Sequence, residues 1–107
     1  MVYIQIQITF PTAELAHEMA AKLVQEKLVA CAQVCGTVQS FYIWKGVCET
    51  SQETLLLAKT TLPLFERIES AVRAAHPYEC PQIVALPIVI VNSDYLDWLN
   101  EQLQDIP

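Results

Sequence analysis

Apolar and polar residues alternate along residues 2–9, and this pattern predicts a β-strand with one buried face. Valine or isoleucine occupies each even position from Val2 to Ile8, whereas the odd positions carry tyrosine, glutamine or threonine. Side chains of an extended strand point alternately to its two faces, and β-branched residues favour that conformation. We therefore expect the even positions to lie in the core.

Two segments show the apolar spacing of amphipathic helices, in which every third or fourth residue faces the core. The first is predicted to begin at Pro11-Thr12. The second is predicted to be capped by Thr60 or Thr61, with Pro63 in its first turn and His76-Pro77 at its end. Their apolar stripes contain Leu15, Met19 and Leu23, with Ala16, Ala20 and Val24 alongside, and then Leu64, Ile68 and Val72, with Phe65 and Ala75.

Three further strands are predicted between and after these helices. The segment Val29–Tyr42 is rich in valine, cysteine and aromatic residues, and Gly36 within it indicates a bend or a bulge. Lys45-Gly46 predicts a hairpin turn, and the run Leu55–Ala58 is typical of a buried central strand. The last strand is expected over Ile83–Val91, interrupted by Pro87.

The predicted order is β-α-β followed by β-α-β, with a short last helix capped by Asn92 or Ser93. This order is typical of an α+β, ferredoxin-like fold, in which an antiparallel sheet carries both long helices on one face. We expect one domain over residues 1–107, with a long bent hairpin between the second and third strands. The other face of the sheet also carries apolar residues, so we expect self-association to cover it.

Composition supports burial between subunits and argues against two classes of partner. The chain is 53% hydrophobic and only 17% charged, which is a low charge content for a small monomer. The net charge of −6 argues against nucleic acid as a partner. Without an apolar run of about 20 residues or a basic-then-apolar leader, we expect no membrane association and a cytoplasmic location.

The four cysteines are expected to be free thiols that pack as small hydrophobic residues. Cys31 and Cys35 would share a face of one strand but stand about 13 Å apart, too far to bind a single metal ion. No Cys-x-x-Cys or His-x-x-x-His motif is present among Cys31, Cys35, Cys48, Cys80 and the two histidines. A closed structural zinc site is therefore not expected.

The most informative segment is the stretch from His76 to Pro81, which we name the connector. Its two prolines fix φ and remove backbone donors, so the backbone must be stiff. One interpretation is a rigid link in which Tyr78 packs and His76 caps a helix. The other is a polar cluster that this stiff backbone directs toward a ligand.

Several motifs together make the chain similar to the divalent-cation tolerance protein CutA family. This resemblance implies a ferredoxin-like homotrimer in which the long second and third strands pair across subunits. It also implies intersubunit clefts like those of PII-type signalling proteins, and an association with tolerance to copper and other divalent ions. The matching residues are Leu28-Val29-Ala30-Cys31-Ala32, Tyr42-x-Trp44-x-Gly46, Lys59-Thr60, His76-Pro77-Tyr78-Glu79-x-Pro81, Leu86-Pro87 and Asp94-Tyr95-Leu96-x-Trp98.

The copper-binding pattern of that family combines a thiol at the end of the first strand with two histidines before Pro-Tyr. This chain carries Ile8 and Ala75 at two of those positions. His76 and Cys31 remain as candidate metal ligands, with Cys80 as an alternative thiol. One imidazole and one distant thiol suit copper poorly, so we expect copper or another divalent cation to bind only weakly.

Three functions are consistent with these residues. The chain could be a metal-binding tolerance protein, a PII-like trimer that binds a small molecule, or a structural partner of other proteins. An enzyme is not expected, because no nucleophile stands beside a base and no glycine-rich phosphate loop is present. A small polar or zwitterionic ligand would be held in an intersubunit cleft by Trp44, Glu53, Lys59, His76, Tyr78, Glu79 and Trp98.

Overall fold

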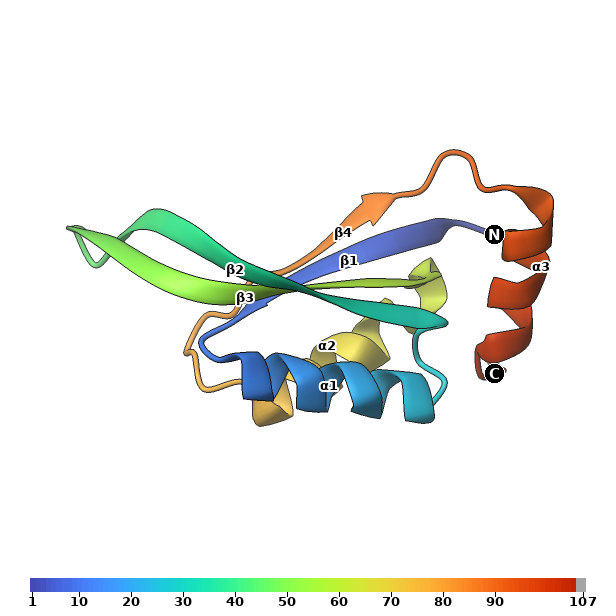
Figure 1. Ribbon diagram of the computed structural model, residues 1–107, viewed down its shortest axis with the longest axis horizontal. Coiled ribbons are helices and arrows are strands. Elements are labelled where there is room, and N and C mark those ends of the chain that lie inside the picture. Colours follow the sequence, from blue (N-terminus) through green and yellow to red (C-terminus); the bar gives the residue numbers. More distant parts are fainter. Residues whose placement is uncertain (106–107) are drawn as a thin grey trace.

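Four antiparallel strands form one sheet in the order β2-β3-β1-β4 in a computed structural model that describes residues 1–105 (Figure 1). The predicted α+β, ferredoxin-like order of elements is confirmed. The strands are β1 (Tyr3–Phe10), β2 (Cys31–Trp44), β3 (Val47–Thr61) and β4 (Ile83–Pro87), and the helices are α1 (Ala13–Gln25), α2 (Phe65–Ala75) and α3 (Ser93–Gln102).

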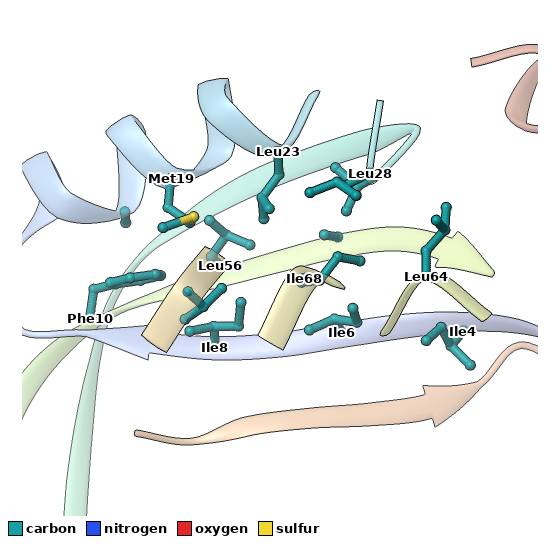
Figure 2. Close-up of a cluster of buried hydrophobic side chains, with 14 residues drawn as sticks. Ile4, Ile6, Ile8, Phe10, Met19, Leu23, Leu28, Leu56, Leu64 and Ile68 are labelled. Atoms are coloured by element: carbon teal, nitrogen blue, oxygen red, sulfur yellow. The ribbon is translucent and has the colours of Figure 1, made fainter. Parts of the chain in front are cut away.

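Helices α1 and α2 cover one face of the sheet and enclose the core (Figure 1). The even positions of β1 are buried from Ile4 onward, as the alternation predicted, whereas Val2 is half exposed. Met19 and Leu23 of α1 point toward Leu56 and the isoleucines of β1 (Figure 2). Val24 is also half exposed, so the predicted stripe of α1 is narrower than expected.

The hairpin of β2 and β3 extends far beyond the rest of the sheet (Figure 1). The pairing of β1 with β3 ends at Phe10 and Thr54, and from there to Trp44 and Val47 the two hairpin strands pair only with each other. We call this two-stranded part, residues 37–54, the ribbon. It is the reason for an elongated molecule of 45 × 26 × 22 Å.

Local backbone geometry confirms the predicted bend and turn of this hairpin. The register of β2 shifts between Val34 and Thr37, where Gly36 has a φ of 62°. Lys45 and Gly46 form the tip with φ values of 50° and 80°. Two positive φ angles match the twist that a tight antiparallel hairpin requires.

The start of the second helix differs from the prediction. β3 continues to Thr61, and a 3-10 turn over Leu62–Leu64 precedes α2. Thr60 and Thr61 therefore do not act as side-chain caps. The Thr60 hydroxyl instead donates a 2.7 Å hydrogen bond to the carbonyl of Leu28, while Thr61 makes no capping hydrogen bond.

The fourth strand is also shorter than predicted, because its partner β1 ends. Pro87 pairs with Ile4, and the amide of Ile88 donates to the carbonyl of Tyr3 at 2.8 Å. Beyond that point the chain leaves the sheet, and the side chains of Val89 and Ile90 are almost fully exposed. The expected strand Ile83–Val91 is thus confined to Ile83–Pro87.

Helix α3 lies at the end of the sheet opposite the ribbon (Figure 1). The Tyr3 hydroxyl donates to Asn100 Oδ1 at 3.0 Å, and the amide of Gln104 donates to the carbonyl of Lys27 at 2.8 Å. Asn92 occupies the cap position, but its side chain bonds to Asp94 rather than capping the helix. No helix of residues 1–105 is long and apolar enough to cross a membrane.

Candidate functional site

An open cleft of about 620 Å³ lies between the ribbon and the connector. The pairing register places several side chains of the ribbon that line this cleft on one face of the ribbon. Tyr42 pairs with Glu49 and Val38 pairs with Glu53, so these four side chains project to the same side. The cleft is lined by Tyr42, Trp44, Glu49 and Glu53 of the ribbon and by Tyr78, Glu79 and Cys80 of the connector, among others.

His76 holds the connector against the end of β1. Its Nε2 lies 2.7 Å from the carbonyl oxygen of Thr9, and its Nδ1 lies 3.2 Å from the backbone nitrogen of Tyr78. The Tyr78 N–H can only donate, so Nδ1 accepts and Nε2 carries the proton that it donates to Thr9. The imidazole also stacks on Phe10, with ring centroids 4.9 Å apart.

This geometry gives His76 a structural role and leaves neither ring nitrogen free to bind a metal ion. The side chain is only 8% exposed and lies behind the cleft rather than in it. The rigid link that the first interpretation expected is present, and the ligand-binding role of the second stays a prediction. The backbone is rigidly anchored through His76, and Tyr78 and Glu79 are directed into a cleft by that anchor.

Tyr78 and Glu53 form the chemical centre of the cleft. Burial raises the pKa of Tyr78 to about 12, with further contributions from the charge and hydrogen bonding of the Glu53 carboxylate. Glu53 is only 7% exposed. A phenol in this position stays protonated and can donate a hydrogen bond to a carboxylate.

Among the residues that line the cleft, none is lysine, arginine or histidine, whereas three are glutamates. The two ion pairs found within residues 1–105, Lys22–Glu26 and Arg73–Glu69, both lie on helices. Glu53 is thus a buried carboxylate without a cationic partner among the residues that the structure describes. Such a group carries a desolvation cost that only hydrogen bonds or a cation can offset.

A second pocket of about 520 Å³ lies toward the other end of the sheet. It contains Lys59, which was predicted to line the ligand cleft, and Cys31, which was predicted to bind a metal ion with His76. Cys31 and Lys59 are directly paired across β2 and β3, and Lys59 Nζ donates to Gln33 Oε1 at 3.2 Å. Burial, followed by hydrogen bonding with Cys31, raises the pKa of Tyr95 in the same pocket.

Within one chain, the structure brings together four of the seven predicted ligand-binding residues. Trp44, Glu53, Tyr78 and Glu79 line the cleft, and His76 supports it from behind. Lys59 lies in the second pocket. Trp98 lines neither pocket and packs beside Tyr95, with ring centroids 5.4 Å apart.

Eight of the residues that line the cleft were not among the predicted ligand-binding residues, namely Thr9, Ser40, Phe41, Tyr42, Glu49, Pro77, Cys80 and Gln82. The signal for two of them was present, because a two-residue turn at Lys45-Gly46 makes Tyr42 and Glu49 direct cross-strand partners. Cys80 carried no comparable signal. Its placement depends on the path of the connector around the end of the sheet.

The proposed metal ligands His76 and Cys31 are not neighbours. Thr9, which bonds to His76, pairs with Leu55, whereas Cys31 pairs with Lys59 four residues along the same strand. Four residues of extended chain span about 13 Å. In the part of the chain that the structure describes, no three histidine, cysteine or acidic side chains are grouped to hold a metal ion.

All four cysteines are free thiols, as predicted. Only Cys31 is partly buried, however, and Cys35, Cys48 and Cys80 are exposed on the single chain. The expectation that all four pack as small hydrophobic residues is therefore wrong for three of them at the level of one chain.

Residues 4–102 match a family model described as the CutA1 divalent ion tolerance protein. The chain belongs to this family. The divalent-cation tolerance protein CutA of Thermus thermophilus is 46% identical over 96 residues, which are 90% of this chain and 93% of the relative. Membership links the chain to divalent-cation tolerance at the level of the family.

Solved CutA1 structures share the whole fold. The Thermus thermophilus protein has a TM-score of 0.92 at 43% identity, covering 95% of this chain and 99% of that one. CutA1 from Oryza sativa has a TM-score of 0.95 at 33% identity, covering 99% and 97%. A protein from Archaeoglobus fulgidus described as the periplasmic divalent cation tolerance protein CutA has a TM-score of 0.91 at 33% identity, covering 95% and 99%.

The role of His76 in this CutA1-family chain predicts a loss of stability that does not depend on metal. Replacing His76→Ala removes two hydrogen bonds and a stacked ring, which should lower the free energy of unfolding by about 2–4 kcal/mol. Urea unfolding at one fixed protein concentration, with and without EDTA, measures this change. A loss seen only without EDTA would contradict the structural role.

The environment of Tyr78 predicts an unusual alkaline titration. The difference in absorbance at 295 nm between the parent and Tyr78→Phe should titrate near pH 12 rather than 10, and Glu53→Gln should lower that midpoint. Because the unfolded phenol ionises at the lower pH, the contribution of Tyr78 to stability is lost between these values. Circular dichroism identifies the range in which the fold persists, and a parent midpoint near 10 within that range would contradict the assignment.

Proposed function

We propose that this chain is a cytoplasmic homotrimer that acts in divalent-cation tolerance by binding a small organic molecule at the cleft between the ribbon and the connector. The observation that carries this proposal is the buried Glu53, which faces a cleft of ligand size without a cationic partner. The role is one of binding rather than catalysis. In keeping with this, the relatives are named as tolerance proteins.

The exposed surface of the ribbon supports the trimer. Phe41 and Ile43 are 73% and 67% exposed, and Val47 beside the tip is 56% exposed. A two-stranded ribbon alone is marginally stable in water, and apolar side chains on it need a covering surface. A neighbouring copy of the chain would supply that surface.

The edge of β2 and the open face of the sheet support the same assembly. β2 has 14 residues, and within residues 1–105 no other strand pairs with its outer edge. On the face without helices, Val84 and Leu86 are about two-fifths exposed. Cyclic closure of three copies would cover these surfaces and remove the unpaired edge.

A second candidate function is the direct binding of copper or another divalent cation, which the names of the relatives suggest. We propose that a single chain binds such ions only weakly. The two nitrogens of His76 are engaged, and Cys31 lies in the other pocket. The tolerance role would then depend on the organic ligand or on a protein partner.

The cytoplasmic location is proposed from the state of the thiols. Three exposed cysteines without disulfide bonds suit a reducing compartment. The net charge of −6 supports the further proposal that nucleic acid is not a partner.

The assembly is tested by light scattering coupled to size-exclusion chromatography. The parent should have about three times the 12.0 kDa mass of the chain, and Ile43→Glu should shift it toward the monomer because a charge would enter an apolar interface. Val24→Glu, a half-exposed site on α1, is the matched control and should remain trimeric. A parent that stays monomeric at micromolar concentration would refute the assembly.

The metal-binding alternative is tested by calorimetric titration of metal-free protein with Cu(I), Cu(II) and Zn(II). We expect weak binding that His76→Ala leaves within about a factor of three, because the imidazole is not a free ligand. One tightly held copper per chain, abolished by His76→Ala but retained by Tyr78→Phe, would establish metal binding as the function instead.

A further inference from the structure

The charge of the cleft restricts the class of ligand that can enter it. Glu49, Glu53 and Glu79 line it, and no lysine, arginine or histidine does so. Glu53 is the most buried of these three glutamates, so an occupant of its part of the cleft would lie next to a poorly solvated carboxylate. A second negative charge beside this carboxylate would be strongly repelled at such low solvent exposure.

Four of the other residues that line the cleft are aromatic. Phe41, Tyr42 and Trp44 come from the ribbon, and Tyr78 faces them from the connector. Trp44 already contacts one cation, because Lys45 Nζ lies 5.8 Å from the centre of its ring. Electron-rich ring faces next to carboxylates are the surroundings that organic ammonium groups favour in proteins.

We propose that the cleft binds a small organic cation whose ammonium group lies beside Glu53 and is enclosed by the aromatic side chains of Tyr42 and Tyr78. This inference deepens the small-molecule role proposed above and rests on it. It also replaces the zwitterionic ligand expected from the sequence, because Lys59, the group that would have bound an anionic end, lies in the other pocket.

A hard metal ion fits the same carboxylates less well. Calcium and magnesium need six or more oxygen ligands in a defined geometry. The lining of the cleft contains aromatic rings as well as acids, and no group of three metal-binding side chains is found anywhere in residues 1–105. An alkylammonium ion needs no such geometry, since it is held by diffuse attraction over its whole surface.

The size of the site agrees with a ligand of metabolite size. Its volume of about 620 Å³ lies within the range of typical small-molecule pockets. The single proton of the Tyr78 phenol is directed to the Glu53 carboxylate, so its oxygen can accept a hydrogen bond from a hydroxyl beside the ammonium group of a ligand.

Choline and its uncharged carbon isostere, 3,3-dimethylbutan-1-ol, provide a matched pair of probes. In a Trp98→Phe background the fluorescence of Trp44 is the remaining tryptophan signal and reports on the cleft. Choline should change this signal saturably, with a dissociation constant at least about tenfold lower than that of the isostere, because only the charge differs. Ethanolamine tests whether a primary ammonium binds as well.

The variant Glu53→Gln tests whether Glu53 is the residue that binds the ammonium group. It should raise the dissociation constant of choline about tenfold or more, whereas Glu14→Gln, which makes the same change of net charge on the exposed start of α1, should leave it unchanged. Tyr78→Phe should weaken binding by a smaller factor, because the ring remains. Light scattering on every variant verifies the same assembly.

Several outcomes would overturn the proposal. These are equal affinity for choline and the isostere, equal effects of Glu53→Gln and Glu14→Gln, or no saturable signal with choline or ethanolamine. Full competition by one equivalent of Cu(II) would also overturn it in favour of metal. An unchanged trimer in which a neutral or anionic metabolite binds the cleft would overturn only the ligand class and leave the proposed function intact.

Discussion

The difference in length between β1 and β3 determines the shape of this molecule. β3 has 15 residues and β1 has 8, so β3 can be enclosed in the sheet over only part of its length. The remainder must pair with β2 alone, as the ribbon. That overhang creates one wall of the cleft and leaves aromatic and aliphatic side chains exposed on the single chain.

His76 links the end of β1 to the connector, which forms the other wall of the cleft. Its Nε2 bonds to the carbonyl of Thr9, near the point where β1 stops pairing with β3. Its Nδ1 bonds to the amide of Tyr78 and thereby fixes the backbone from which Tyr78 and Glu79 project. The cleft is therefore built at the end of β1, where the ribbon leaves on one side and the connector crosses on the other.

The elements of the fold could be predicted because each has its own local signal. Period-two alternation identified β1, and helical spacing identified α1 and α2. Contacts between elements determined the strand ends and hydrogen-bond partners that the local pattern could not predict. Ile83–Val91 looked like one strand, yet β4 stops at Pro87 because β1 provides no further partner. Thr60 looked like a helix cap, yet its hydroxyl bonds to the carbonyl of Leu28 in the loop before β2.

The candidate site could be predicted only in part, again because contacts between residues far apart in the sequence determine it. Glu53 and Lys59 were grouped as one cluster because both are polar residues, at positions suggested by the family resemblance, that core packing does not explain. Six residues of extended strand nevertheless separate them by about 20 Å, which places them in different pockets. Metal binding was assigned to His76 by residue type, but the partners of its two nitrogens depend on how the connector folds back on Thr9. Neither pairing has a local sequence signal.

The N-terminus and helix α3 lie together at the end of the molecule remote from the hairpin tip (Figure 1). The Tyr3 hydroxyl and Asn100 even touch across this end. A reporter protein fused ahead of Tyr3 would consequently sit beside α3 and away from the cleft. The chain could thus serve as the scaffold of a fluorescent biosensor, in which the cleft and the fluorescent reporter lie at opposite ends of the molecule.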